Sequence, residues 1–203
     1  MRKIYITAIL LIGLTISSYA QSSYWSLNWD ITKAAGDTGD YIGNINFRGV
    51  SFDGRAFIND NISIGGSVAW YTLYDKLSGL PPIEIDNGDG TAGHISGTQA
   101  RYLNLVPVLI NSHFYFDSGG DFKPYIGIGL GGIYTEQRTE IGLSSFSSDS
   151  YAFGAQPEIG VYIPFGYSGT GLNLALRYLY GTSAGDLDSL SMFTFAIGIG
   201  FMN

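Results

Sequence analysis

The feature that most constrains this chain is a two-residue alternation of side chains that recurs from Ser23 to the C-terminus. In the last segment a strongly apolar set alternates with a set of small residues: Phe193, Phe195, Ile197, Ile199 and Phe201 against Thr194, Ala196, Gly198 and Gly200. Successive side chains of a β-strand point to opposite faces, so this pattern predicts strands with two different faces. We expect eight strands, of which the second and fourth are less regular: 24–31, 41–57, 62–70, 99–116, 125–131, 151–163, 172–180 and 193–201.

The connections between these segments alternate strictly between long and short. Long polar segments cover 33–40, 75–98, 137–150 and 183–190, whereas short turns cover 59–61, 117–121 and 166–169. An even number of antiparallel strands, with both ends of the chain on the side of the short turns, produces this order. Transmembrane β-barrels of bacterial outer membranes are built in this way. The sequence therefore predicts an all-β fold, an eight-stranded antiparallel up-and-down barrel with periplasmic termini.

The composition decides whether the apolar face meets lipid or a soluble core. A secreted β-sandwich or a lipocalin-like barrel would also alternate, but its water face would carry many charged side chains. Charged residues make up only 13% of this chain, about half of the usual ~25%. The less apolar face instead carries mostly Gly, Ala, Ser, Thr, Asn and Tyr, as a narrow lumen would. We therefore expect the apolar face to contact outer-membrane lipids.

Aromatic residues near the strand ends support the same interpretation. Two belts are expected on the apolar face, the first on the loop side and the second on the turn side: Tyr41, Trp70, Tyr74, Tyr134, Tyr151 and Tyr180, and Phe57, Phe116, Phe165 and Phe201. Aromatic belts that flank an aliphatic band are typical of the two membrane interfaces.

The first 20 residues have the pattern of a secretory signal peptide. Arg2 and Lys3 precede the apolar run Ile4–Ile16, and Ser18-Tyr19-Ala20 provides a small-x-small cleavage site. The run is too short to span a bilayer, which needs about 20 apolar residues. We expect Sec-type export with cleavage before Gln21, and one barrel domain over 21–203.

Three segments resemble the small outer-membrane β-barrel proteins of the OmpA/OmpX type, the outer-membrane protein β-barrel domain family. They are Phe57–Gly66, Phe122–Gly131 and Pro157–Val161, and the resemblance extends over nearly all of 21–203. It implies a barrel in the outer membrane, and it implies that the Phe193–Phe201 alternation is read by the barrel-assembly machinery. The chain departs from the family's usual aromatic end, because it closes on Phe201-Met202-Asn203. These motifs specify architecture and not activity.

The interior of an eight-stranded barrel is just wide enough for its own side chains. We predict a polar network in this lumen formed by Glu158, Arg177, Asp30, Arg48, Gln156 and His113. A hairpin centred between residues 167 and 168 places Glu158 opposite Arg177, and Asp30 and Arg48 lie on adjacent strands. The network is either a structural plug or a gate or relay for protons or ions. Pro107 and Pro157 fall inside strands, where the missing N–H predicts irregular pairing.

Other classes of function find little support. The chain has no cysteine, which excludes disulfides, thiolate metal sites and a Cys nucleophile. Removing Arg2 and Lys3 with the leader leaves 8 basic against 17 acidic residues, which argues against a nucleic-acid partner. Acyl transfer by His94 and Ser96 with Glu84 is a remote alternative, and Asp86–Gly90 lacks the ligand spacing of an EF-hand. We expect no catalytic residue, no cofactor and no metal.

The expected function is therefore that of a non-catalytic outer-membrane barrel with a plugged polar lumen and a structural or loop-mediated role. Its acidic loops would meet an extracellular partner that the sequence does not identify. The main alternative is a channel for small solutes or hydrophobic compounds, and a lipid-modifying enzyme ranks third.

Overall fold

The computed structural model describes residues 22–78, 83–86, 92–95, 97–116, 122–142, 144–166, 168–183 and 188–203. The predicted signal peptide lies outside these residues. The elements, in chain order, are β1 Ser23–Ala34, α2 Gly36–Tyr41, β2 Ile45–Phe57, β3 Ile62–Leu77, β4 Ile83–Asp86, β5 Ala92–Ile95, β6 Gln99–Tyr115, β7 Lys123–Ile141, β8 Ser144–Pro164, β9 Thr170–Gly181 and β10 Leu190–Met202. None of the helices in the described part of the chain is long and apolar enough to cross a membrane.

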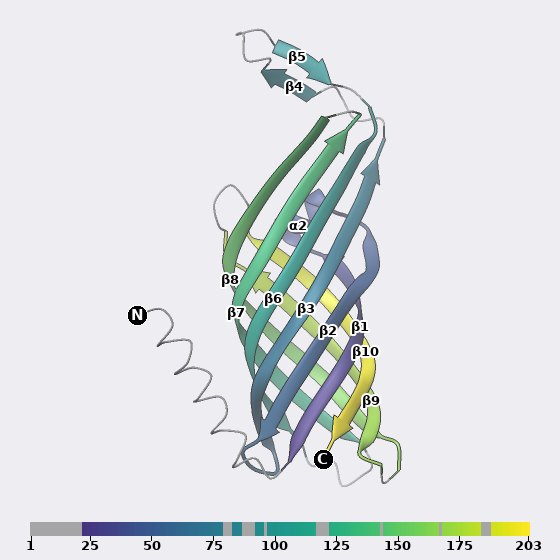
Figure 1. The fold of residues 1–203 in the computed structure, drawn as a ribbon, viewed down its shortest axis with the longest axis vertical. Helices are drawn as coiled ribbons and strands as arrows, with labels where there is room; N and C mark the ends of the chain where they lie inside the picture. Colours follow the sequence, from purple (N-terminus) through teal and green to yellow (C-terminus); the bar gives the residue numbers. More distant parts are fainter. Residues whose placement is uncertain are drawn as a thin grey trace, which may run out of the picture.

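Eight of these strands close into a barrel, in the order β1-β10-β9-β8-β7-β6-β3-β2 (Figure 1). All eight neighbouring pairs are antiparallel, which confirms the predicted fold. The barrel is closed by β1 and β10, and the backbone N–H of Ser23 donates to the carbonyl of Asn203 at 3.1 Å. The first residue of β1 and the last residue of the chain therefore lie together at the end of the barrel that has the short turns. This is the periplasmic end in outer-membrane barrels.

The outer surface of the barrel is apolar. Its aliphatic band includes Leu27, Val50, Val68, Val108, Ile110, Ile126, Ile128, Leu130, Ile159, Leu176 and Ile199. Exposed aromatic residues flank this band, with Trp70, Tyr151 and Tyr180 toward the loops and Phe116, Phe165 and Phe201 toward the turns. So much exposed apolar surface requires a hydrocarbon environment, so this face is the one that meets lipid.

Two residues assigned to the aromatic belts lie elsewhere. Tyr41 belongs to α2 and packs against the apolar interior at the loop end, since the segment after β1 forms a helix and not a strand. Phe57 packs against Tyr115 with ring centroids 5.1 Å apart, at the turn end of the interior. The prediction of a lipid-facing position was wrong for both residues.

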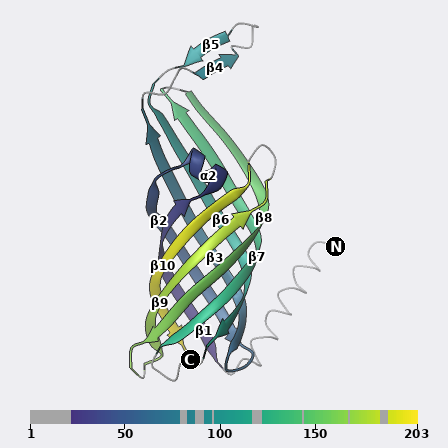
Figure 2. The same ribbon diagram turned by 180° about the vertical axis from the view of Figure 1, so that it is seen from behind.

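Four neighbouring strands, β3, β6, β7 and β8, extend beyond the others at the loop end (Figures 1 and 2). The expected loop 137–150 is in fact mostly strand, because β7 continues to Ile141 and β8 begins at Ser144. The Ser-rich sequence of this region has the composition of a loop, but polar side chains on both faces also suit a sheet that stands in water. We call the four extended strand ends the raised wall.

Pairing is irregular at both prolines, as predicted. The β3–β6 ladder has no residue pair between Val68↔Val108 and Tyr71↔Leu105, which is the position of Pro107. The β8–β9 ladder has a similar gap between Ala155↔Tyr180 and Glu158↔Arg177, at Pro157. A proline cannot donate to a ladder, so in each case the pairing is interrupted on one side of its strand.

The lipid-facing assignment predicts a position-dependent effect of charge. Ile128 and Phe146 are both 50% exposed, but Ile128 lies in the middle of the aliphatic band and Phe146 lies on the raised wall. Ile128→Arg should lower the free energy of unfolding by about 2–4 kcal/mol, as for an arginine at the bilayer midplane, and Phe146→Arg by about 1 kcal/mol or less. Urea unfolding in phospholipid vesicles measures both. Equal losses would contradict the assignment.

Candidate functional site

The lumen contains a compact cluster of four charged side chains near the turn end: Asp53, Arg55, Glu158 and Arg177, which we call the ionic plug. Arg177 lies 2.8 Å from Asp53 (Nη2 to Oδ2) and 2.9 Å from Glu158 (Nε to Oε2). Arg55 Nη2 lies 3.0 Å from Glu158 Oε1 and 3.7 Å from Asp53 Oδ1. All four side chains are at least 96% buried. Two cations and two anions thus balance each other inside the barrel.

Aromatic residues and a histidine complete the Arg55 and Glu158 side of the plug. The Arg55 guanidinium lies over the rings of Tyr24 and Tyr125, 4.8 and 5.0 Å from their centroids. Its Nη1 donates to the Tyr115 hydroxyl at 2.9 Å. Glu158 Oε1 also lies 2.6 Å from Nε2 of His113. Burying a charge is costly unless it is paired and hydrogen-bonded, and these contacts supply that compensation.

The Asp53 side is held by neutral polar groups. Asp53 Oδ2 accepts hydrogen bonds from Ser26 Oγ at 3.2 Å and from Asn28 Nδ2 at 2.9 Å. Asn173 Nδ2 donates to Asn28 Oδ1, and its own Oδ1 accepts from the Tyr125 hydroxyl, each at 2.9 Å. The network therefore joins side chains from six of the eight barrel strands: β1, β2, β6, β7, β8 and β9.

An apolar layer fills the lumen on the loop side of the plug. Its buried members include Tyr71, Leu73, Leu105, Ile133, Leu179 and Met192. Helix α2 lies across the mouth above this layer (Figure 2). The backbone N–H of Ser191 in β10 donates to Thr38 Oγ1 at 3.0 Å, and the hydroxyl of Tyr41 donates to the carbonyl of Arg138 in β7 at 3.1 Å. Partial burial raises the pKa of the Tyr41 hydroxyl.

The predicted pairing of Glu158 with Arg177 is found in the structure, with the two residues opposite each other in the β8–β9 register. His113 belongs to the same network, and Gln156 is buried in the lumen. Asp30 is also buried, but neither of its carboxylate oxygens has a hydrogen-bond partner among the described residues. No ion pair joins it to Arg48.

Arg48 is exposed on the outside of the barrel, so its predicted lumen position is wrong. The β1–β2 register shifts between Asp30↔Gly49 and Thr32↔Asn46, so two residues of β2, Phe47 and Arg48, stand opposite one residue of β1. Both point outward, and the inward parity of β2 changes from even to odd numbers. A bulge of this kind re-aims every side chain that follows it.

Because of the same bulge, two members of the plug were not predicted from the sequence. Asp53 and Arg55 were not among the predicted lumen residues, because a lumen position for Arg48 implies that the even-numbered residues of this strand point inward. The sequence contains the signal that corrects this. Val50 and Phe52 are apolar and alternate with Ser51 and Asp53, which places the polar residues inside from position 49 onward.

Metal-ligating side chains can be placed only for the described residues. These residues contain no group of three or more His, Cys, Asp or Glu side chains that could hold a metal ion. Glu84 and His94 are opposite each other in the β4–β5 register, but their side chains and Ser96 lie outside the described part of the structure.

Comparison with known proteins finds no matching family model. The chain is 23% identical over 180 residues to the outer membrane protein AlkL of Ectopseudomonas oleovorans, and the match covers 79% of this chain and 76% of AlkL. Neisserial surface protein A has a similar structure, with a TM-score of 0.57 at 16% identity over 88% of this chain and 96% of that one. The attachment invasion locus protein Ail of Yersinia pestis gives a TM-score of 0.53 at 10% identity, over 90% of this chain and 98% of Ail.

These similarities show the fold of a small outer-membrane β-barrel. The apolar exterior and the paired aromatic belts are the features that such a fold needs in a membrane. The chain is therefore an integral outer-membrane β-barrel protein.

Asp30 and Asp53, which are both fully buried in the lumen, should respond differently to neutralisation. Asp53 accepts two hydrogen bonds and is paired with Arg177, so Asp53→Asn should lower the free energy of unfolding by about 3–5 kcal/mol, as when one partner of a buried ion pair is removed. Asp30 has no such partners, so Asp30→Asn should cost less than about 1 kcal/mol. Urea unfolding in vesicles compares them. A loss at Asp30 as large as that at Asp53 would contradict this account.

The plug also depends on a glycine beneath His113. A Cβ atom at Gly127 would lie 2.2 Å from the ring of His113, whereas one at Gly132 on the same strand would meet no atom within 4 Å. Gly127→Ala should therefore destabilise the barrel by about 1–3 kcal/mol, and Gly132→Ala should change stability by less than about 0.5 kcal/mol. If the two variants have the same urea midpoint, His113 is not packed as described.

Proposed function

We propose that this protein is a non-catalytic outer-membrane barrel whose lumen is kept closed by the ionic plug and whose activity is exerted at its loop end. The observation that carries the proposal is the set of four buried charges on β2, β8 and β9, whose hydrogen-bond network joins six strands across the lumen. Each charge has at least one opposite charge within hydrogen-bonding distance.

The free energy needed to break the buried ion pairs supports a closed lumen. To open a water path, Arg55 or Arg177 would have to leave carboxylates to which they are paired within 3.0 Å. Breaking one buried pair costs about 3–5 kcal/mol, because the remaining charge is left uncompensated. An open state at that free energy would be populated at the level of about 1% or less.

The loop end offers the surface for an interaction. The raised wall of β3, β6, β7 and β8 stands beside the mouth, and α2 bridges from this wall to β10. Acidic side chains border the mouth, including Asp37, Asp40 and Asp188. These features support a loop-mediated role with an extracellular partner that carries positive charge.

A channel for hydrophobic compounds is the second candidate, and one observation favours it. On the loop side of the plug the lumen is filled by the apolar layer that includes Tyr71 and Met192, and not by the polar residues of an aqueous pore. An apolar solute could enter this layer if α2 moved. The plug beneath it would still block passage toward the turn end.

Electrical recording separates the two candidates. Purified protein, refolded in detergent and shown by its heat-modifiable migration to be a barrel, should give no discrete conductance steps in a planar bilayer. The plug variant Arg177→Ala, which leaves Glu158 and Asp53 with fewer partners, should give openings at a frequency at least about tenfold above wild type. Tyr151→Ala on the outer face serves as the control and should remain silent.

Regular openings of the wild-type protein would contradict closure and favour the channel. In that case the loss of conductance in Glu158→Ala or Arg177→Ala would identify the pair as part of the conducting path.

A further inference from the structure

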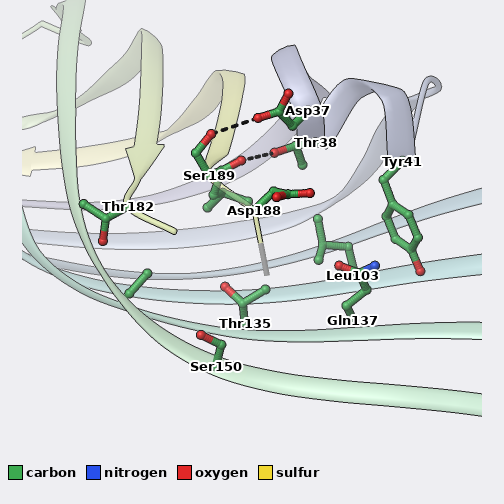
Figure 3. Close-up of a pocket in the computed structure, with 12 residues that line it drawn as sticks. Asp37, Thr38, Tyr41, Leu103, Thr135, Gln137, Ser150, Thr182, Asp188 and Ser189 are labelled. Atoms are coloured by element: carbon green, nitrogen blue, oxygen red, sulfur yellow. Dashed lines mark hydrogen bonds between the residues drawn. The ribbon is translucent and has the colours of Figure 1, made fainter. Parts of the chain in front are cut away.

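A small cavity of about 140 Å³ lies at the mouth of the barrel, between α2 and the raised wall (Figure 3). Thr38 of α2 and the segment Asp188–Ser189 before β10 form one side. Leu103 of β6 and Thr135 and Gln137 of β7 form the other side. The volume is similar to that of a protein cavity that accommodates benzene, so a ligand of about six to eight non-hydrogen atoms would fill it.

The charge in this cavity has one sign. Asp37 and Asp188 both line it, and the described lining residues include no Lys, Arg or His. Asp37 Oδ2 accepts a hydrogen bond from Ser189 Oγ at 3.1 Å, which fixes one carboxylate. Within the described part of the chain, Asp188 makes no ion pair and lies between Thr38 and Leu103 in Figure 3. A cation would therefore be attracted and an anion repelled.

A second observation independently indicates a ligand. Thr135 is only 6% exposed, yet its hydroxyl makes no hydrogen bond with any other described residue and faces the cavity (Figure 3). Buried polar groups in proteins are nearly always hydrogen-bonded, so this hydroxyl bonds to a molecule inside the cavity, either water or a ligand that displaces it. Thr38, by contrast, is already occupied, because its Oγ1 accepts from the Ser191 N–H at 3.0 Å and lies 3.3 Å from the Ser189 carbonyl.

We propose that this cavity binds the ammonium group of a small primary amine that carries a short apolar chain. Asp188 would pair with the ammonium, Thr135 Oγ1 would accept one of its N–H groups, and the methylene groups would lie against Leu103, Ala152 and Leu190. An ammonium ion fits better than a metal, because no group of three metal-ligating side chains exists among the described residues.

This site is distinct from the ionic plug, since its lining shares no residue with the plug. It does not require the lumen to open. A ligand would reach it from the loop side, and it would occupy the position where α2 meets the raised wall. Amine binding at the mouth is independent of the proposed closure of the lumen, so a negative result for binding leaves the closed lumen unchallenged.

The test uses the full mature barrel in detergent micelles and n-butylammonium as the probe, with 1-butanol and butyrate as matched probes of the same length. At pH 7 a primary amine is fully protonated, since its pKa lies near that of lysine, about 10.4. Chemical shifts of the Thr135 backbone amide and the Gln137 side-chain amide report on the site. We expect saturable shifts with n-butylammonium, at a dissociation constant on the order of 1 mM.

Three variants, each checked for heat-modifiable migration, make the test specific. Asp188→Asn should weaken binding at least about tenfold, and Thr135→Val about threefold, since each removes one proposed partner of the ammonium. Asp149→Asn is the control, because it removes the same charge from an exposed position on β8 that does not line the cavity.

The proposal is overturned if 1-butanol or butyrate binds as tightly as n-butylammonium. It is also overturned if Asp149→Asn weakens binding as much as Asp188→Asn does, since the effect would then be one of surface charge alone. The proposal is also overturned if n-butylammonium causes no saturable chemical-shift changes at concentrations well above about 1 mM.

Discussion

The ion pairs among Asp53, Arg55, Glu158 and Arg177 are the interactions on which the rest of this barrel depends. An eight-stranded barrel must fill its own interior, and here much of that filling is charge. The four charges sum to zero and are surrounded by tyrosine rings, a histidine and amide groups, and the whole network draws on six strands. Buried pairs are not strong sources of stability, but they are highly specific. They form only when β2, β8 and β9 present these faces to the lumen in the observed register.

The barrel itself could be predicted from sequence because its signal is repeated eight times. Each strand alternates with period two, and each connection has a length that suits its end of the barrel. The Glu158–Arg177 pair could also be predicted, because a short turn near residue 167 fixes the register of β8 on β9. Register propagates from a tight turn, so local sequence is sufficient there.

The features that could not be predicted from the sequence depend on irregular backbone, on a sheet in water or on contacts between distant residues. The bulge at Phe47 and Arg48 reverses the parity of β2, and it moved Arg48 out of the lumen and Asp53 and Arg55 into it. Polarity alone also failed to separate strand from loop in Ser144–Ser150, because a sheet that stands in water has no apolar face to reveal it. The mouth cavity depends on contacts between Thr38 and Ser191, which are 153 residues apart.

The plug has a further consequence for the assembly of the barrel. Asp53 and Arg55 belong to the N-terminal half of the chain, while Glu158 and Arg177 belong to the C-terminal half, so Arg55 finds its glutamate partner 103 residues later. Without β8, Arg55 and His113 lack the carboxylate of Glu158, and Arg55 keeps only Asp53 at 3.7 Å. The plug is completed only when Glu158 of β8 and Arg177 of β9 join Asp53 and Arg55 of β2, so closure of the lumen requires strands from both halves of the chain.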